Sequence, residues 1–433
     1  MKIHIRGGRL VDPANKIDEP LDVFVSDGLI TAIGSPPFGF RADRELDARG
    51  CIVAPGLIDL AVRLGEPGFE HKATIASEAK AAAAAGITTV CCPPDTQPVI
   101  DTPAVLELVH QRAEAAGLVR VVALGALTQN LDGVTLSAMA ALKEAGCVGV
   151  TNAYTPVQNP LIMRRALEYA GTFDLTAFLV AEDQHLRNSG CINEGAVGTR
   201  LGLPGVPHSA ETVAVARDLA LIEQTGARAH FCRLSTAQAT QMIARAQYDG
   251  LPVSADVSAH HLHLTDMDCA DFNSDCHVRP PLRTQRDRDK LRQGVASNTI
   301  AAICSDHQPH EADAKRRPFA ETEAGISALE TLLPLSLRLV HDRALSVTDM
   351  VARLSTQPAS ILGIDGGNLA VGQRADICVF DLDTNWQIHP STLVSRGHNS
   401  PFFGWDLQGR VRFTLLKGGV VFEFNPEAGA QSG

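Results

Sequence analysis

Short apolar runs separated by amphipathic stretches dominate the middle of the 433-residue chain. The runs expected to form buried strands lie at 57–62, 87–92, 119–125, 147–152, 175–181, 228–234, 252–257 and 299–305. Between them, residues 73–85, 103–116, 161–170, 209–224 and 236–248 have the apolar spacing of helices. Nearly continuous apolar strands that alternate with helices indicate a parallel sheet covered on its outside. The repeat therefore predicts an α/β fold, a (β/α)8 TIM barrel.

The two ends of the chain have a different pattern. Residues 1–53 contain short strand-like pieces at 3–5, 22–25 and 29–33, separated by turn residues. Strand patterns return at 375–380, 411–414 and 420–422. We therefore predict a barrel domain at 54–362 and a small β-sandwich composed of 1–53 and 363–433. The tail from about Asn425 is small and polar, and we expect it to be frayed.

Composition narrows the class of protein. Apolar residues make up 45 % of the chain, enough for a large core, and the net charge of −11 argues against nucleic acid or anionic membrane as a partner. The ten cysteines include no Cys-x-x-Cys pair and lie mostly in apolar runs, as expected for reduced core thiols in the cytoplasm. The chain begins with a strand pattern rather than a signal peptide, and no apolar run reaches the roughly 18 residues of a membrane helix.

Short motifs stand at the predicted strand ends and loop starts. They include Pro55-Gly56-Leu57-Ile58-Asp59, Glu66-Pro67-Gly68, Glu182-Asp183, Ser235-Thr236, His260-His261, Pro280-Pro281-Leu282-Arg283, Asp306-His307-Gln308-Pro309-His310 and Asn399-Ser400-Pro401-Phe402. On these motifs the chain resembles the amidohydrolase superfamily and, within it, the dihydroorotases, over nearly its whole length. The resemblance implies an amidohydrolase-type barrel with one or two zinc ions at the C-terminal strand ends, which activate water and polarise an amide carbonyl.

The positions at which the resemblance implies metal ligands hold other residues. The replacements are Ala61 and Arg63 for two histidines after strand 1, Asn152 and Ala153 for the acidic ligand after strand 4, and Val180 and Arg233 for the histidines after strands 5 and 6. Asp306, the ligand after strand 8 and the general acid and base of active relatives, is retained. One carboxylate cannot hold a catalytic zinc ion, and two arginines would repel it.

The substrate-binding positions are altered as well. Gly65 replaces the arginine that would bind a substrate carboxylate, Asp95 replaces an asparagine and would repel an anionic substrate, and Arg279 replaces a second asparagine. We therefore predict a barrel without catalytic residues, metal or cofactor. An Asp306 buried without a cation would be costly, so we predict that Arg63, Arg233 or both pair with it.

The remaining polar motifs are expected to be structural. Asp306, His307 and His310 match a catalytic motif, but without the other ligands we interpret them as the vestige of a site that now anchors a loop. We expect His260-His261 to have a structural or outer-shell role and Glu182-Asp183 to cap and position a loop.

The resemblance is strongest to the non-catalytic dihydroorotase homologues that some bacteria keep as subunits of aspartate carbamoyltransferase. It implies a structural subunit in pyrimidine biosynthesis that binds the transferase catalytic chains, with self-association inside a large hetero-oligomer. Two alternatives remain. One is an active zinc-dependent cyclic amidohydrolase with a site rebuilt around Asp306, His260, His261 and His310. The other is a regulator that binds a carboxylate or phosphate through Arg63, Arg233 and Arg279.

Overall fold

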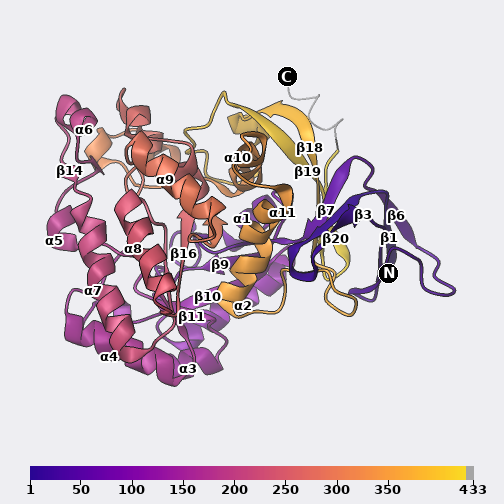
Figure 1. Ribbon diagram of the computed structural model, residues 1–433, viewed down its shortest axis with the longest axis horizontal. Coiled ribbons are helices and arrows are strands. Elements are labelled where there is room, and N and C mark those ends of the chain that lie inside the picture. The colour runs from indigo at the N-terminus through magenta and orange to yellow at the C-terminus, as the bar shows by residue number, and fades with distance from the viewer. Residues whose placement is uncertain (426–433) are drawn as a thin grey trace.

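The computed structural model describes residues 1–425, and a parallel eight-stranded barrel forms its centre (Figure 1). The barrel strands are β8 (Leu57–Asp59), β9 (Ile87–Cys92), β10 (Arg120–Ala126), β11 (Gly149–Thr151), β12 (Thr176–Leu179), β15 (Ala229–Phe231), β16 (Val253–Ser258) and β17 (Ala302–Cys304). Just beyond the ends of β8 and β17, the Arg63 amide donates to the His307 carbonyl oxygen and the His307 amide donates to that of Ala61, both at 3.0 Å, which closes the barrel. The predicted barrel fold is confirmed, and each predicted strand overlaps one of these.

Helices cover the outside of the barrel (Figure 1). They are α1 (Ile75–Ala84), α2 (Pro103–Ala116), α3 (Met139–Glu144), α4 (Pro160–Thr172), α7 (Ser209–Thr225), α8 (Ala237–Tyr248), α9 (Gln285–Ala296) and α10 (Leu329–His341), followed by α11 (Val347–Val351) and α12 (Gln357–Leu362). Side-chain caps explain several of their starts: Thr74 caps α1 with a reciprocal bond from Ser77, and Thr236 caps α8. Between β12 and α7 the chain adds α5 (Gln184–Arg187), β13 (Ile192–Asn193), α6 (Ala196–Leu201) and β14 (Gly205–Val206).

Strands from both ends of the chain build two further sheets beside the barrel. One has the order β5-β4-β1-β6 and the other β20-β19-β18-β7-β2-β3. Their bounds are β1 (Lys2–Arg6), β2 (Arg9–Asp12), β3 (Ile17–Pro20), β4 (Val23–Ser26), β5 (Leu29–Ile33), β6 (Arg44–Asp47), β7 (Cys51–Pro55), β18 (Ile377–Gln387), β19 (Asp406–Leu416) and β20 (Gly419–Glu423). One core cluster contains Ile3 and Val25 of the first sheet and Val53, Ile377 and Leu415 of the second, so the sheets face each other.

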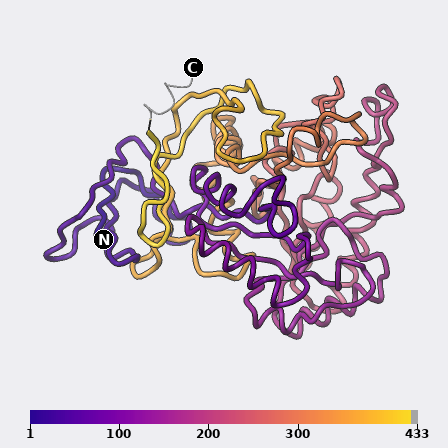
Figure 2. The backbone as a smooth tube through the Cα atoms, turned by 180° about the vertical axis from the view of Figure 1, so that it is seen from behind, coloured from indigo at the N-terminus to yellow at the C-terminus, as the bar shows by residue number. Residues whose placement is uncertain are grey.

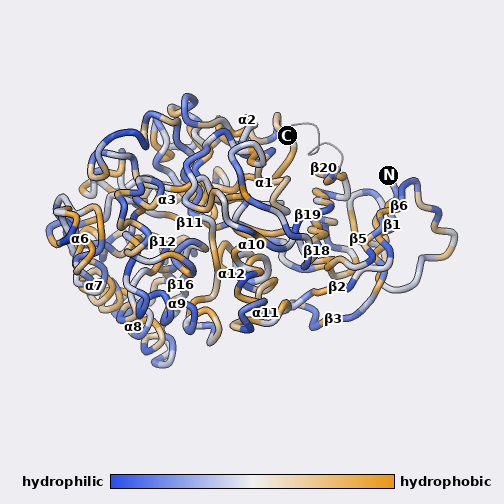
Figure 3. Tube along the Cα trace, turned by 90° about the horizontal axis from the view of Figure 1, so that it is seen from above, coloured by the Kyte–Doolittle hydropathy of each residue, from blue (hydrophilic) through white to orange (hydrophobic). Residues whose placement is uncertain are grey.

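The N-terminal strands (indigo) and the C-terminal strands (yellow) therefore lie side by side at one end of the molecule, as Figures 1 and 2 show from opposite sides. The view from above in Figure 3 places these strands on one side and the barrel with its helices on the other. In the part of the chain that is described, no helix is both long and apolar enough to cross a membrane. The tail expected to be frayed lies, apart from Asn425, outside the described residues.

Candidate functional site

Asp306 lies just beyond the carboxyl end of β17, where a TIM barrel carries its chemistry. Its side chain is 2 % exposed, and two cations approach the same oxygen: Arg63 Nη1 lies 3.6 Å and Arg233 Nε 3.5 Å from Oδ1. Gln308 donates a hydrogen bond to Oδ2 at 3.1 Å. The prediction that the two arginines pair with this carboxylate is confirmed.

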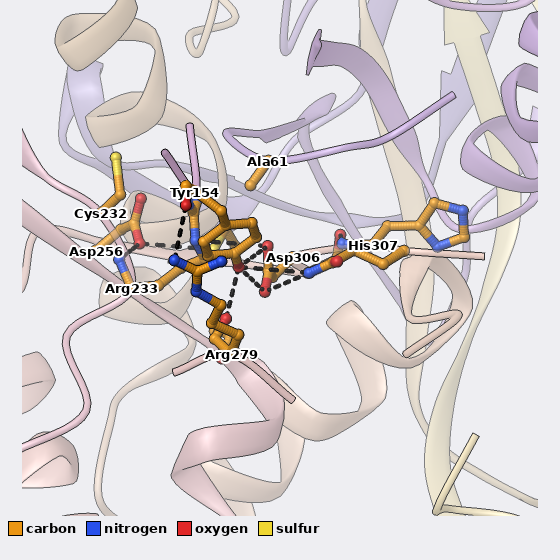
Figure 4. A network of polar contacts seen from close by, with 12 residues as sticks. Ala61, Tyr154, Cys232, Arg233, Asp256, Arg279, Asp306 and His307 are labelled. Carbon is orange, nitrogen blue, oxygen red and sulfur yellow. Dashed lines mark hydrogen bonds and ion pairs between the residues drawn. The ribbon is translucent and has the colours of Figure 1, made fainter. Parts of the chain in front are cut away.

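Tyr154 is the centre of the cluster, although no sequence motif pointed to it. The carbon centres of the Arg63, Arg279 and Arg233 guanidiniums lie 4.7, 4.9 and 5.1 Å from its ring centroid, within the range of cation–π contacts. Figure 4 shows Arg233 and Arg279 beside the ring. Its hydroxyl lies 2.6 Å from the Arg279 carbonyl oxygen and 3.0 Å from Asp306 Oδ2. Burial raises the pKa of Tyr154, so the phenol keeps its single proton for one of these two acceptors.

Two of the residues that depart from the family pattern pair with each other. Asp95, in the substrate-binding position, accepts hydrogen bonds from Arg63 Nε at 2.9 Å and from Nη2 at 2.7 Å. Burial by itself lowers the pKa of Arg63, but Asp95, Tyr154 and Asp306 outweigh that effect and raise it. Asp95 therefore holds the Arg63 cation in place beside Asp306.

Arg279 forms a second pair of this kind. It donates through Nε to Glu182 at 3.1 Å and through Nη2 to the Tyr154 carbonyl oxygen at 2.7 Å, and a further contact joins Nη2 to Glu182. Arg187 approaches Glu182 to 3.6 Å. Asp183 accepts from the amides of two residues in the first turn of α5, so the Glu182-Asp183 pair caps and positions a loop as predicted.

Gly65 stands where the resemblance implies an arginine, and the loop there leaves no room for a larger side chain. Its φ is +75°, and a Cβ atom there would lie 2.3 Å from the carbonyl oxygen of Ala73. A larger residue would therefore need a different loop conformation. What remains at the mouth is a pocket of about 320 Å³, lined by Arg63 and Asp95 together with Lys72, His310 and Glu323.

The other ligand positions offer no donor atom to a metal. Ala61 and Ala153 have only methyl side chains. The side-chain oxygen Oδ1 of Asn152 already accepts hydrogen bonds from the Thr128 amide at 3.1 Å and from the Thr128 hydroxyl at 2.9 Å. Zinc needs imidazole, carboxylate or thiolate ligands at about 2 Å. Because Val180 is apolar and both arginines already face Asp306, this set of residues does not fit the metal that active relatives use.

The histidines retained from the motifs serve the framework. His307 donates from Nε2 to Glu78 at 2.8 Å and accepts the Ala328 amide at Nδ1, and Figure 4 shows its ring directed away from Asp306. His310 donates to the Ala324 carbonyl oxygen at 2.9 Å. His260 and His261 both contact the Ser258 hydroxyl, at 3.0 and 2.6 Å. These contacts agree with the predicted anchoring and structural roles.

A second polar group lies deeper in the barrel. Among residues 1–425, His230, Cys232 and Asp256 are the one group of three potential ligands whose donor atoms lie within 4.8 Å of one another. Both imidazole nitrogens of His230 and both carboxylate oxygens of Asp256 already have hydrogen-bond partners in the protein. This group therefore needs no metal to satisfy its polar atoms.

Comparisons with known proteins agree with this fold. The family model described as dihydro-orotase-like matches residues 50–239, and one described as an amidohydrolase family matches 328–422. A dihydroorotase-like protein from Pseudomonas aeruginosa is 49 % identical over 98 % of this chain and 100 % of its own, and a dihydroorotase from a Geobacter species is 41 % identical over the same shares. The solved L-hydantoinase from Arthrobacter aurescens superposes with a TM-score of 0.86 at 24 % identity, covering 97 % of this chain and 96 % of its own.

Proposed function

Because the chain belongs to the dihydroorotase-like family of amidohydrolases, we propose that it is a non-catalytic member and serves as a structural subunit. Its proposed partner is the catalytic chain of aspartate carbamoyltransferase, with several copies of each in one cytoplasmic complex. The partner is inferred from the family of non-catalytic homologues that the motifs resemble. The barrel would then be retained for the surface it presents.

The observation that best supports a non-catalytic role is the environment of the Asp306 carboxylate. In an active relative this carboxylate would bind metal and transfer protons, and both roles need access to the reacting atoms. Here it is 2 % exposed and is contacted by Arg63, Arg233, Tyr154 and Gln308. The protein's own cations take the place of a metal charge at this carboxylate.

The same contacts disfavour a regulator that binds an anion through the three arginines. Arg63 is paired with Asp95, Arg233 with Asp306 and Arg279 with Glu182. An anionic ligand would have to displace a carboxylate from one of these pairs, which are held at partly or fully buried positions. Calorimetry with carbamoyl aspartate, dihydroorotate and nucleotides tests this alternative, and we expect no heat of binding.

Retained dihydroorotase activity is the competing function, because several relatives carry that name. We would measure zinc content and the cyclisation of carbamoyl aspartate with the purified full chain, before and after incubation with zinc. We expect neither bound zinc in stoichiometric amount nor turnover. Stoichiometric zinc together with turnover that Asp306→Asn abolishes would overturn the non-catalytic proposal.

Assembly is tested separately. The chain would be co-expressed with the aspartate carbamoyltransferase of the same host and analysed by size-exclusion chromatography and a transferase assay. We expect co-elution in a large particle and a transferase that is more stable or more active than it is alone. Separate elution with unchanged transferase activity would overturn the proposed partner, whatever the outcome of the zinc experiment.

A further inference from the structure

A serine, a histidine and an aspartate form a continuous hydrogen-bonded row inside the barrel, which meets the cluster around Asp306 only at its aspartate end. Ser254 Oγ lies 2.8 Å from His230 Nδ1, and His230 Nε2 lies 2.9 Å from Asp256 Oδ2. The row follows from strand register, because His230 on β15 is paired with Ser254 on β16 and residues 254 and 256 point to the same face of the strand. All three side chains therefore face the barrel interior.

The hydrogen bonds determine which way the protons point. Besides His230, Asp256 accepts the Arg233 amide at 2.6 Å and the Cys304 thiol at 3.6 Å through its other oxygen. With donors on both of its oxygens, Asp256 acts as a hydrogen-bond acceptor. A neutral His230 then donates from Nε2 to Asp256 and accepts from the Ser254 hydroxyl at Nδ1.

One end of this row reaches the surface. Ser254 is partly exposed, whereas His230 and Asp256 are 0 % and 1 % exposed. Ser254 lines a cleft of about 620 Å³ at the amino-terminal ends of the strands, opposite the mouth that holds Asp306. Lys143, Arg228 and Asp174 line the same cleft, where Arg228 is paired with Asp174 and Lys143 donates to the Phe173 carbonyl oxygen. The serine is thus at the cleft, the imidazole behind it and the carboxylate behind the imidazole.

We propose that Ser254 is a nucleophile for small carboxylic esters, with His230 as its general base and Asp256 holding the imidazole in the reactive tautomer. The nucleophile–base–acid order is that of a catalytic triad, with the two imidazole nitrogens exchanged. Ser254 Oγ attacks the ester carbonyl carbon while its proton passes to His230 Nδ1. The carbon–oxygen bond to the alcohol then breaks, the alcohol leaves with that proton, and water releases the carboxylic acid by the same steps.

The competing interpretation is that these hydrogen bonds only satisfy a buried histidine, since the amino-terminal face of a barrel is ordinarily structural. Reactivity separates the two interpretations, because a hydroxyl that only fills a hydrogen bond has no enhanced nucleophilicity. The test uses the full chain with a fluorophosphonate probe and with p-nitrophenyl acetate. Adducts are located by peptide mass spectrometry, and ester hydrolysis is followed by release of p-nitrophenol.

We expect a fluorophosphonate adduct on Ser254 and ester hydrolysis that falls about a hundredfold or more in Ser254→Ala, the scale of lost general base catalysis. Ser258→Ala is the matched control, because Ser258 lies on the same strand and contacts two histidines but is fully buried. It should keep both reactivities. No adduct on Ser254 of the unmodified chain, or equal hydrolysis by Ser254→Ala and the unmodified chain, would overturn the proposal. Circular dichroism confirms that each variant is folded.

Discussion

Replacing Arg233 by methionine tests the claim that the protein supplies its own cation to Asp306. The change keeps an unbranched side chain and much of its apolar volume, although methionine is shorter, and it removes one of the two charges beside the carboxylate. Arg233 is 8 % exposed and Asp306 2 %, so solvent can compensate little of the lost charge. Breaking such a buried pair costs about 3–5 kcal/mol. Because Arg63 remains 3.6 Å away, we expect a cost below this range, about 2–3 kcal/mol.

Urea unfolding followed by far-ultraviolet circular dichroism measures the change. Arg164→Met is the matched control, because Arg164 pairs with Glu168 at 44 % and 48 % exposure and should cost at most about 0.5 kcal/mol. In the double variant Arg233→Met with Asp306→Asn, no charged carboxylate remains at position 306. We therefore expect about 1–2 kcal/mol of the lost unfolding free energy to be recovered. Two outcomes would refute the reasoning: Arg233→Met and Arg164→Met lose the same unfolding free energy, or the double variant recovers none of the loss.

Three further substitutions test the Tyr154 ring, the loop at Gly65 and the buried carboxyl group of Glu330. Tyr154→Phe keeps the ring under the three guanidiniums but loses the hydroxyl, and should cost about 1 kcal/mol of unfolding free energy, whereas Tyr154→Ala should cost about 3–5 kcal/mol in the same urea assay. Gly65→Ala should lower the melting temperature, because its Cβ would lie 2.3 Å from a carbonyl oxygen; an unchanged value would contradict the closed loop. Burial raises the pKa of Glu330 from 4.5 to about 7, so the folded state holds a proton that the unfolded state has lost. Stability should therefore fall as the pH rises from about 4.5 to about 7, and Glu330→Gln should flatten that part of the curve in unfolding experiments across this range.

The barrel was predictable because its signal is carried by the apolar runs themselves. Strands buried on both faces leave near-continuous apolar sequence, and every such run from 57–62 to 299–305 forms a barrel strand. The pairing of Arg63 and Arg233 with Asp306 was predictable too, since strand ends converge at one face of a barrel and a buried carboxylate needs a cation.

The central role of Tyr154 was not predictable in the same way. It lies in the loop after β11, and the direction of a loop side chain depends on backbone angles that the sequence pattern does not specify. The family pattern treats each position separately, so it does not predict that Asp95 pairs with Arg63 or that Glu182 pairs with Arg279. For Ser254 and Asp256, by contrast, the two-residue spacing on a predicted strand was a usable signal for a shared face.

The pairing of Arg63 with Asp95 has a consequence for how this chain could change over evolutionary time. A histidine at position 63 alone would leave Asp95 without its partner and would remove one cation from Asp306. That single step therefore passes through a less stable protein, and a matching change at position 95 would have to accompany it. Positions 63 and 95 are thus expected to change together rather than one at a time.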